Sequence, residues 1–176
     1  MNETTRIVYC RERGAMWGAT ATVPDCANAS HAHFESEIHR HRTLVALPDG
    51  SVVVAASFDP NDPYTREDPP DFGLYFDRHW SPPWQHAQFD WPDFGVPAST
   101  ADLRNALAGL HERSRRGERV ELGCLGAHGR TGTALACLAV LAGVPASSAV
   151  AWVRRAHCEK AVETPDQAAL VASFGG

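Results

Sequence analysis

A glycine-rich segment holds one cysteine and one arginine six positions apart, Cys124 and Arg130. Its sequence is GCLGAHGRTGT over residues 123–133, between the apolar segment VEL and a longer apolar run. A loop that joins a strand to a helix can point successive backbone N–H groups inward, and the helix N-terminus adds partial positive charge. Arg130 can add a planar, two-pronged contact to phosphate oxygens. The pattern predicts a binding site for a tetrahedral anion, with Cys124 at its floor.

The same surroundings favour the thiolate form of Cys124, because positive charge at a helix N-terminus stabilises a sulfur anion. A thiolate is a nucleophile, and its attack on phosphorus requires an acid that protonates the departing oxygen. Asp93 lies 31 positions upstream in WPDFGVP, where prolines and a glycine indicate a loop and Trp91 an apolar hinge. Closure of this loop would bring the Asp93 carboxyl over the anion and exclude water.

Other anion-binding motifs fit the segment less well. The phosphate-binding loop of nucleoside triphosphatases ends in Gly-Lys-Ser/Thr, and no lysine is present here. The spacing of Gly123, Gly126 and Gly129 is not that of the dinucleotide motif Gly-x-Gly-x-x-Gly. A sulfurtransferase of the rhodanese kind also uses a cysteine in an anion-binding loop, but it has no use for the aspartate loop.

Length and composition set the frame for this site. The 176 residues, 44% of them hydrophobic, predict a single domain over residues 1–176, with a loop-rich part to about residue 70 and a core over about 72–173. A formal net charge of −5 gives no support for a nucleic-acid partner. The first residues lack a secretory signal, and no apolar run is long enough to cross a bilayer. We therefore expect a cytoplasmic protein with no membrane partner; the sequence leaves the oligomeric state open.

The five cysteines are odd in number and include no Cys-x-x-Cys pair. A reducing compartment argues against a disulfide framework. Cys137 falls in the apolar run and Cys158 follows a predicted helix, so packing is the expected role of both. The sequence does not decide the roles of Cys10 and Cys26, and any of the four could serve as a resolving thiol for an oxidised Cys124.

Histidines raise two further questions. The tract from His31 to His41 offers metal-ligand side chains, but Arg40 and Arg42 oppose a cation, and an exposed polar strand or loop explains the pattern more simply. We therefore expect neither a metal nor a cofactor. His128 lies inside the glycine-rich segment and either contacts substrate or faces solvent.

The elements that position the site follow from periodicity and turn signals. Strands separated by helices of ten or more residues predict an α/β domain with a mostly parallel central sheet flanked by helices. Ser99 or Thr100 can cap a helix whose leucines at 103, 107 and 110 share one face. The predicted strands are 43–47, 51–56, 72–76, 86–89 and 120–122, and the helices are one that begins at 99 or 100, 131–142, one that begins at 147 or 148, and one that begins at Thr164-Pro165.

Taken together, WPDFGVP and CLGAHGRTG resemble the cysteine-dependent protein tyrosine phosphatase superfamily. Its mobile acid loop, the WPD loop, is Trp-Pro-Asp-x-Gly-x-Pro, and its P-loop is Cys, five residues, Arg, then Ser or Thr. The resemblance covers about residues 72–167, and the short chain favours the compact, dual-specificity-like bacterial type. The order of acid before nucleophile differs from that of the low-molecular-weight phosphatases and arsenate reductases.

The resemblance implies roles for individual residues. Cys124 would form a phosphocysteine intermediate, Asp93 would protonate the leaving group and then activate water, and Thr131 would hydrogen-bond the sulfur. The segment from Glu163 to Gln167 is similar to the Gln-Thr-x-x-Gln that positions the hydrolytic water, with glutamate in place of the first glutamine. Phosphoryl oxygens would be bound by Arg130 and the loop amides of Leu125, Gly126, Ala127, His128 and Gly129, and Trp91 would join Glu163 and Gln167 at the water site or substrate rim.

Departures from the family pattern concern specificity. Gly123 stands where the family usually has histidine, and no Asn-Arg-Tyr segment grips a phosphotyrosine ring. The absence of lysine from residues 125–129 makes a polyanionic substrate less favoured. The implied function is a protein tyrosine or dual-specificity phosphatase that acts on a phosphorylated protein. Two alternatives stay open: a phosphatase of aryl, prenyl or other metabolite phosphates or diphosphates, and a catalytically silent phosphate-binding module.

Overall fold

The computed structural model describes residues 4–10, 15–18, 33–39, 41–58, 66–78 and 80–175. The chain divides into two compact units, Met1–Arg40 and His41–Gly176. That the whole chain acts as one phosphatase domain stays a prediction.

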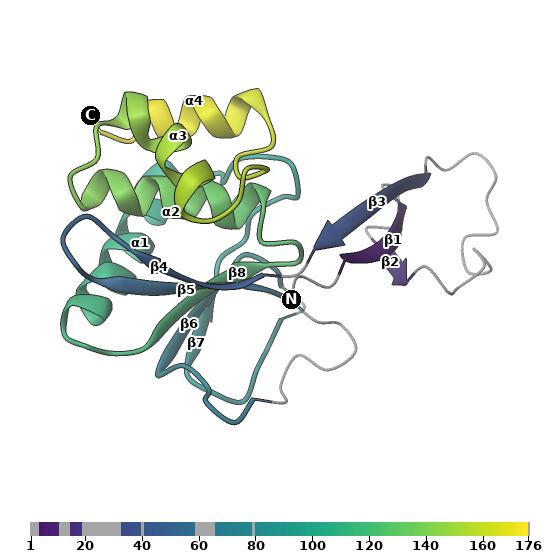
Figure 1. The fold of residues 1–176 in the computed structure, drawn as a ribbon, viewed down its shortest axis with the longest axis horizontal. Coiled ribbons are helices and arrows are strands. Elements are labelled where there is room, and N and C mark those ends of the chain that lie inside the picture. Colours follow the sequence, from purple (N-terminus) through teal and green to yellow (C-terminus); the bar gives the residue numbers. More distant parts are fainter. Residues whose placement is uncertain are drawn as a thin grey trace. The chain divides into compact units, whose positions relative to one another are not determined.

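The first unit contains a three-stranded antiparallel sheet in the order β2-β1-β3 (Figure 1). Its strands are β1 (Thr4–Cys10), β2 (Ala15–Gly18) and β3 (His33–His39). Neither β1 nor β2 was predictable from the sequence, because both are short segments without a clear alternation of apolar and polar residues. The third strand covers part of the histidine tract, while residues 31, 32 and 40 of that tract, and Cys26, lie outside the described residues.

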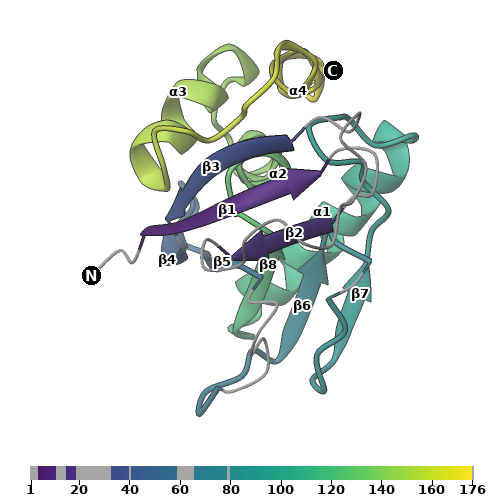
Figure 2. The same ribbon diagram turned by 90° about the vertical axis from the view of Figure 1, so that its right-hand side faces the viewer.

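The second unit is built on a five-stranded sheet in the order β4-β5-β8-β6-β7. Only β4 runs antiparallel to its neighbour, and the strands β5, β8, β6 and β7 are parallel (Figure 2). The predicted α/β class with a mostly parallel sheet is confirmed. The strands are β4 (Arg42–Ala46), β5 (Val52–Ser57), β6 (Phe72–Tyr75), β7 (His86–Gln88) and β8 (Val120–Cys124).

Four helices accompany this sheet: α1 (Thr100–Arg115), α2 (Gly129–Leu141), α3 (Ala146–Ala156) and α4 (Pro165–Ser173). Helix α2 contacts both β8 and α1, and α3 and α4 pack on α2 on the side away from the sheet (Figure 1). Residues 129–139 of α2 are all buried, as expected for a helix enclosed on every side. The helix begins two residues before its predicted start at 131, because Gly129 and Arg130 already belong to its first turn.

Local signals for turns and helix starts agree with the structure. The Ser99 side chain accepts a hydrogen bond from the Asp102 N–H at 3.1 Å, and Thr164 caps α4 with Pro165 at its first turn. Gly50 closes the β4–β5 hairpin with φ +86°, a conformation that glycine adopts without strain. Among the described residues, no helix combines the length and apolar character needed to cross a membrane.

Candidate active site

Cys124 ends the central strand β8 at the edge where parallel strands point their carboxyl ends, the usual location of ligand sites in open α/β sheets. The residue is only 3% exposed. Its Sγ accepts a hydrogen bond of 3.1 Å from the Thr131 hydroxyl, which comes from the first turn of α2. Strand end and helix start therefore bring the predicted nucleophile and its hydroxyl partner into contact.

The glycine-rich loop, residues 124–130, connects β8 to α2. Ala127 adopts φ +55°, an uncommon conformation for a residue other than glycine, and its carbonyl is 2.7 Å from His157 Nε2. The His128 carbonyl accepts hydrogen bonds from the N–H groups of Gly132 and Val162, at 2.9 and 3.3 Å. These contacts hold the backbone of the loop in one conformation. The His128 side chain does not cap the N-terminus of α2.

Arg130 links the glycine-rich loop to the aspartate segment. Its Nη2 lies 3.2 Å from Asp93 Oδ1, and its Nη1 donates to the carbonyl of Phe76 at 2.7 Å and to that of Trp91 at 3.3 Å. The Nε atom is buried without a hydrogen-bond partner among the described residues. The Nε–H group of Arg130 can therefore donate a hydrogen bond to a phosphoryl oxygen.

Neighbouring groups keep the Arg130 guanidinium protonated. Burial, the largest influence, lowers the pKa of the guanidinium, but electrostatic interactions with Cys124, Asp93 and Asp77 together raise the pKa above its ordinary value. The side chain therefore stays a cation although it is only 7% exposed.

In the acid loop, residues 91–97, the Gly95 carbonyl is the acceptor of two side-chain hydrogen bonds. Gly95 O accepts hydrogen bonds from Trp91 Nε1 at 2.8 Å and from Gln167 Nε2 at 3.3 Å. Asp93 itself remains about one-third exposed. The loop backbone bends at Phe94, which has φ +57° and is 53% exposed.

Trp91, predicted to join Glu163 and Gln167 at the water site or substrate rim, lies in the interior of the fold. The residue is 3% exposed and packs edge-to-face on Phe76, with ring centroids 5.2 Å apart. Because its indole N–H bonds the carbonyl of Gly95 in the same loop, the ring serves as an internal anchor of the acid loop.

Gln167 and Glu163 lie behind and beside the glycine-rich loop. Gln167 is fully buried, and its Oε1 accepts a hydrogen bond of 2.9 Å from the Glu163 N–H. The Glu163 carboxylate reaches the backbone N–H of Gly129, where any Cβ would overlap it. Burial of the carboxylate and then repulsion by Asp93 raise the pKa of Glu163 to about 7.

Gly123, which directly precedes Cys124, has a structural reason to be glycine. A Cβ at this position would lie 2.7 Å from the Trp80 ring and would overlap the carbonyl of Ala56. Trp80 is fully buried and stacks on Tyr75 with ring centroids 4.2 Å apart. Trp80 therefore fills the space that a side chain before Cys124 would need.

The surroundings of His128 were not predictable from the sequence. The ring is 6% exposed, so the alternative that it faces solvent is wrong, and its Nε2 lies 3.0 Å from Nε2 of His41. His41 is also buried, in contrast to the exposed position predicted for its tract. Both Cys158, which lies near these rings, and Cys137 in α2 are buried, in agreement with their expected packing. No local signal reveals the His41–His128 contact, because 87 positions separate the two residues.

Comparisons with known proteins identify relatives of unknown activity and solved structures of the same fold. No family model matches the chain. Two uncharacterized proteins of Methanocaldococcus jannaschii, MJECL20 and MJ0215, are 37% and 34% identical over 82 residues, or 47% of this chain. These 82 residues are 54% and 50% of the relatives, so the chain matches about half the length of each curated relative.

The solved structures are more distant in sequence. Tk-PTP in its active form has a TM-score of 0.60 at 23% identity, with 74% of this chain and 95% of that chain covered. Human DUSP28 has a TM-score of 0.60 at 13% identity, covering 76% and 94%. PTPMT1 in complex with PI(5)P has a TM-score of 0.58 at 12% identity, covering 70% and 89%. The resemblance predicted from the two motifs is confirmed at the level of the fold.

Proposed function

We propose that this chain, which has the fold of the cysteine-dependent protein tyrosine phosphatases, hydrolyses phosphomonoesters through a phosphocysteine intermediate. One observation carries the proposal: Arg130, from the glycine-rich loop that begins at Cys124, pairs with Asp93 of the acid loop. A nucleophile, a cation and an acid thereby face one anion site from two separate loops.

In the first step, the Cys124 thiolate attacks phosphorus. The sulfur–phosphorus bond forms, the ester bond breaks, and the protonated Asp93 carboxyl gives its proton to the departing oxygen. Arg130 and the backbone N–H groups of residues 125–130 hold the phosphoryl oxygens as charge builds on them. Closure of the Asp93 loop over the bound phosphoryl group would exclude water during this step.

In the second step, water hydrolyses the phosphocysteine. Asp93, now a carboxylate, accepts a proton from water as the new oxygen–phosphorus bond forms and the bond to sulfur breaks. The Thr131 hydroxyl, 3.1 Å from the sulfur, stabilises the returning thiolate. Gln167 holds the acid loop through Gly95, and the Glu163 carboxylate is the group of this segment that orients the water.

The rim favours an aryl phosphate, such as phosphotyrosine in a protein. Two exposed apolar side chains of the acid loop, Phe94 and Val96, follow Asp93 in the sequence and offer contact to an aromatic leaving group. Residues 125–129 contain no lysine that would attract a polyanion such as the PI(5)P of the PTPMT1 complex. The cytoplasmic location stays a prediction, consistent with the need for a reduced thiol.

The test is turnover of a chromogenic aryl phosphate by the wild-type protein and by Cys124→Ser. We expect the variant to lose turnover while it retains vanadate binding, because the anion site stays intact. Cys137→Ala is the matched control: burial raises the pKa of that thiol to about 12, so it contributes no thiolate and its removal leaves turnover in place. Turnover by Cys124→Ser contradicts the mechanism.

Two further outcomes separate the alternatives. Vanadate binding by a wild-type protein without turnover indicates a silent phosphate-binding module, and transfer of sulfur from thiosulfate to cyanide indicates a sulfurtransferase. If turnover is present, phosphopeptides compared with a panel of metabolite phosphates identify the substrate class. Activity on free small phosphates alone excludes a role in protein dephosphorylation.

A further inference from the structure

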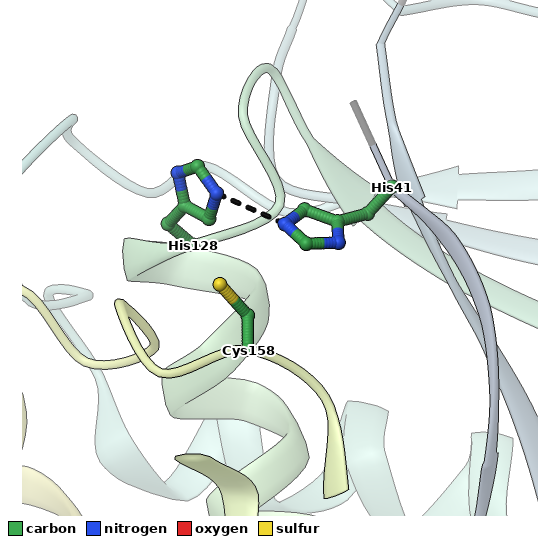
Figure 3. Close-up of side chains that lie close together, drawn as sticks. All are labelled: His41, His128 and Cys158. Carbon is green, nitrogen blue, oxygen red and sulfur yellow. Dashed lines mark hydrogen bonds between the residues drawn. The ribbon is translucent and has the colours of Figure 1, made fainter. Parts of the chain in front are cut away.

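Three buried metal-ligand side chains meet behind the glycine-rich loop: His41, His128 and Cys158 (Figure 3). One nitrogen from each imidazole and the Cys158 sulfur all lie within 4.8 Å of one another. Figure 3 shows the sulfur directed toward the two rings, whose Nε2 atoms are 3.0 Å apart. The side chains are 9%, 6% and 6% exposed, so the three groups are gathered in the interior of the second unit.

Each of the three residues is held by its own part of the chain. His41 precedes β4, and its backbone exchanges hydrogen bonds with Ser57: the His41 N–H donates to Ser57 Oγ at 2.9 Å, and the Ser57 N–H donates to the His41 carbonyl at 2.8 Å. Cys158 follows α3, and its sulfur accepts a contact of 3.4 Å from the Lys160 N–H. The His157 ring packs on His41, with centroids 4.6 Å apart. The ligand atoms are thus positioned before any ion arrives.

The donor set has a clear chemical preference. Two imidazole nitrogens and one thiolate are ligands of borderline-soft transition ions, and zinc binds such sets in tetrahedral geometry. Nitrogens ~2.0–2.1 Å from a zinc ion lie about 3.4 Å apart in a tetrahedron. The Nε2 atoms of His41 and His128, which are 3.0 Å apart, are close to this spacing. Small ring movements complete the three-ligand arrangement, and the fourth position is left for water.

We propose that His41, His128 and Cys158 bind a single zinc ion that ties the glycine-rich loop to the start of β4 and the end of α3. The ion takes the place of the hydrogen bond between the two rings, and the Cys158 thiol releases its proton as the sulfur–zinc bond forms. Since His128 stands between Ala127 and Gly129, the ion stiffens the loop that holds the phosphate. The site does not depend on the proposed hydrolysis.

Burial raises the pKa of the Cys158 thiol, the Lys160 N–H lowers it, and the charges of Glu159 and Glu163 raise it. Because zinc binds a deprotonated sulfur, the ion must displace the proton of this thiol.

The experiment is a titration of the full chain with Co²⁺, followed by competition with Zn²⁺. Cys124→Ser serves as the parent, because the thiolate of Cys124 could itself bind the probe. We expect one equivalent of Co²⁺ to bind with a thiolate-to-cobalt charge-transfer band and the visible absorption of tetrahedral cobalt, and one equivalent of Zn²⁺ to remove both. The melting temperature of the parent rises with Zn²⁺, because the ion binds only the folded protein.

Variants on the parent assign the ligands. Adding Cys158→Ala removes the charge-transfer band, and adding His41→Ala weakens Co²⁺ binding at least tenfold. The matched controls are Cys137→Ala and His111→Gln, which remove a buried cysteine and a buried histidine elsewhere in the unit and leave the spectrum unchanged. Metal-free melting temperatures identify any variant that fails to fold, and His41→Gln then replaces His41→Ala.

Two results overturn the proposal. One is a charge-transfer band that persists after Cys158→Ala, and the other is Zn²⁺ affinity equal in the parent and in His41→Ala. Cys158→Ala in the protein that retains Cys124 is expected to keep its metal-free turnover of the aryl phosphate, so a failure of the zinc site and a failure of phosphatase activity are separately visible.

Discussion

The Asp93 carboxylate lies 3.2 Å from the Arg130 guanidinium, although the two residues belong to different loops. The same guanidinium binds the Trp91 carbonyl, so Arg130 holds the acid loop by its backbone as well as by its carboxylate. An incoming phosphoryl group must share Arg130 with Asp93. This relationship is the basis of the first prediction.

Asp93→Asn is expected to lower kcat for an aryl phosphate by about 10²–10⁴, because the amide cannot donate a proton to the leaving oxygen. The pH–rate profile of the variant should lack the limb that reports the protonated acid in the wild-type profile. The control is Asp90→Asn, an exposed carboxylate three positions earlier, with unchanged kcat. A variant at position 93 with wild-type kcat and an unchanged pH profile contradicts the assignment.

Thr131→Val is expected to slow turnover by about 10- to 100-fold, since a hydrogen bond to a charged group contributes about 1.5–3 kcal/mol. The step affected is the departure of the Cys124 thiolate, so stopped-flow traces should show a burst of product followed by slow turnover. Thr133→Val is the matched control: its hydroxyl is equally buried but donates to the Gly129 carbonyl at 2.7 Å. Equal rates for the two variants would show that the contact to sulfur has no role.

Glu163→Gln is expected to strengthen phosphate and vanadate binding above pH 7, because the wild-type carboxylate, with its pKa raised to about 7, becomes negative beside the anion site there. The affinity of the wild type relative to that of the variant should fall as the pH rises through 7. Isothermal titration calorimetry from pH 5.5 to 8.5 measures the difference. Parallel pH dependences in the two proteins would exclude Glu163 as the titrating group.

The same residue links stability to pH. A carboxyl whose pKa is raised on folding binds its proton more tightly in the folded state, so its favourable contribution is complete below the ordinary value of 4.5 and is lost as the pH rises through about 7. The melting temperature of Glu163→Gln relative to the wild type should therefore increase between pH 5 and pH 8. Thermal unfolding at the two pH values checks the sign, and a relative decrease would contradict it.

Gly123→Ala is expected to lower the free energy of unfolding by about 1–3 kcal/mol, the usual cost of forcing an extra methyl into a packed interior, here against Trp80 and the Ala56 carbonyl. Gly109→Ala in α1 is the control, since a Cβ there meets nothing within 4 Å, and it should stabilise the helix by about 0.5–1 kcal/mol. Urea unfolding measures both. If Trp80→Leu does not reduce the cost of Gly123→Ala in a double-mutant cycle, contact with the Trp80 ring is not the source of that cost.

The features that could be predicted from the amino-acid sequence depend on residues that are close together in the chain. The strand, loop and helix around Cys124 are consecutive in the chain, so the spacing of Cys124 and Arg130 already specifies their relation. The helix starts at Ser99 and Thr164 depend on side-chain bonds that span three residues, and the hairpin depends on a single positive φ at Gly50. The class of the sheet followed from the alternation of these elements.

Only the tertiary structure decided the contacts between distant segments. The strand order β4-β5-β8 brings His41, which precedes β4, close to His128, which follows β8. Trp80 and the Ala56 carbonyl leave no room for a side chain at position 123. The burial of Trp91 and the raised pKa of Glu163 depend on neighbours from other loops. Such contacts are set by how the layers pack, because burial and electrostatic interactions act between atoms near in space, whatever their separation along the chain.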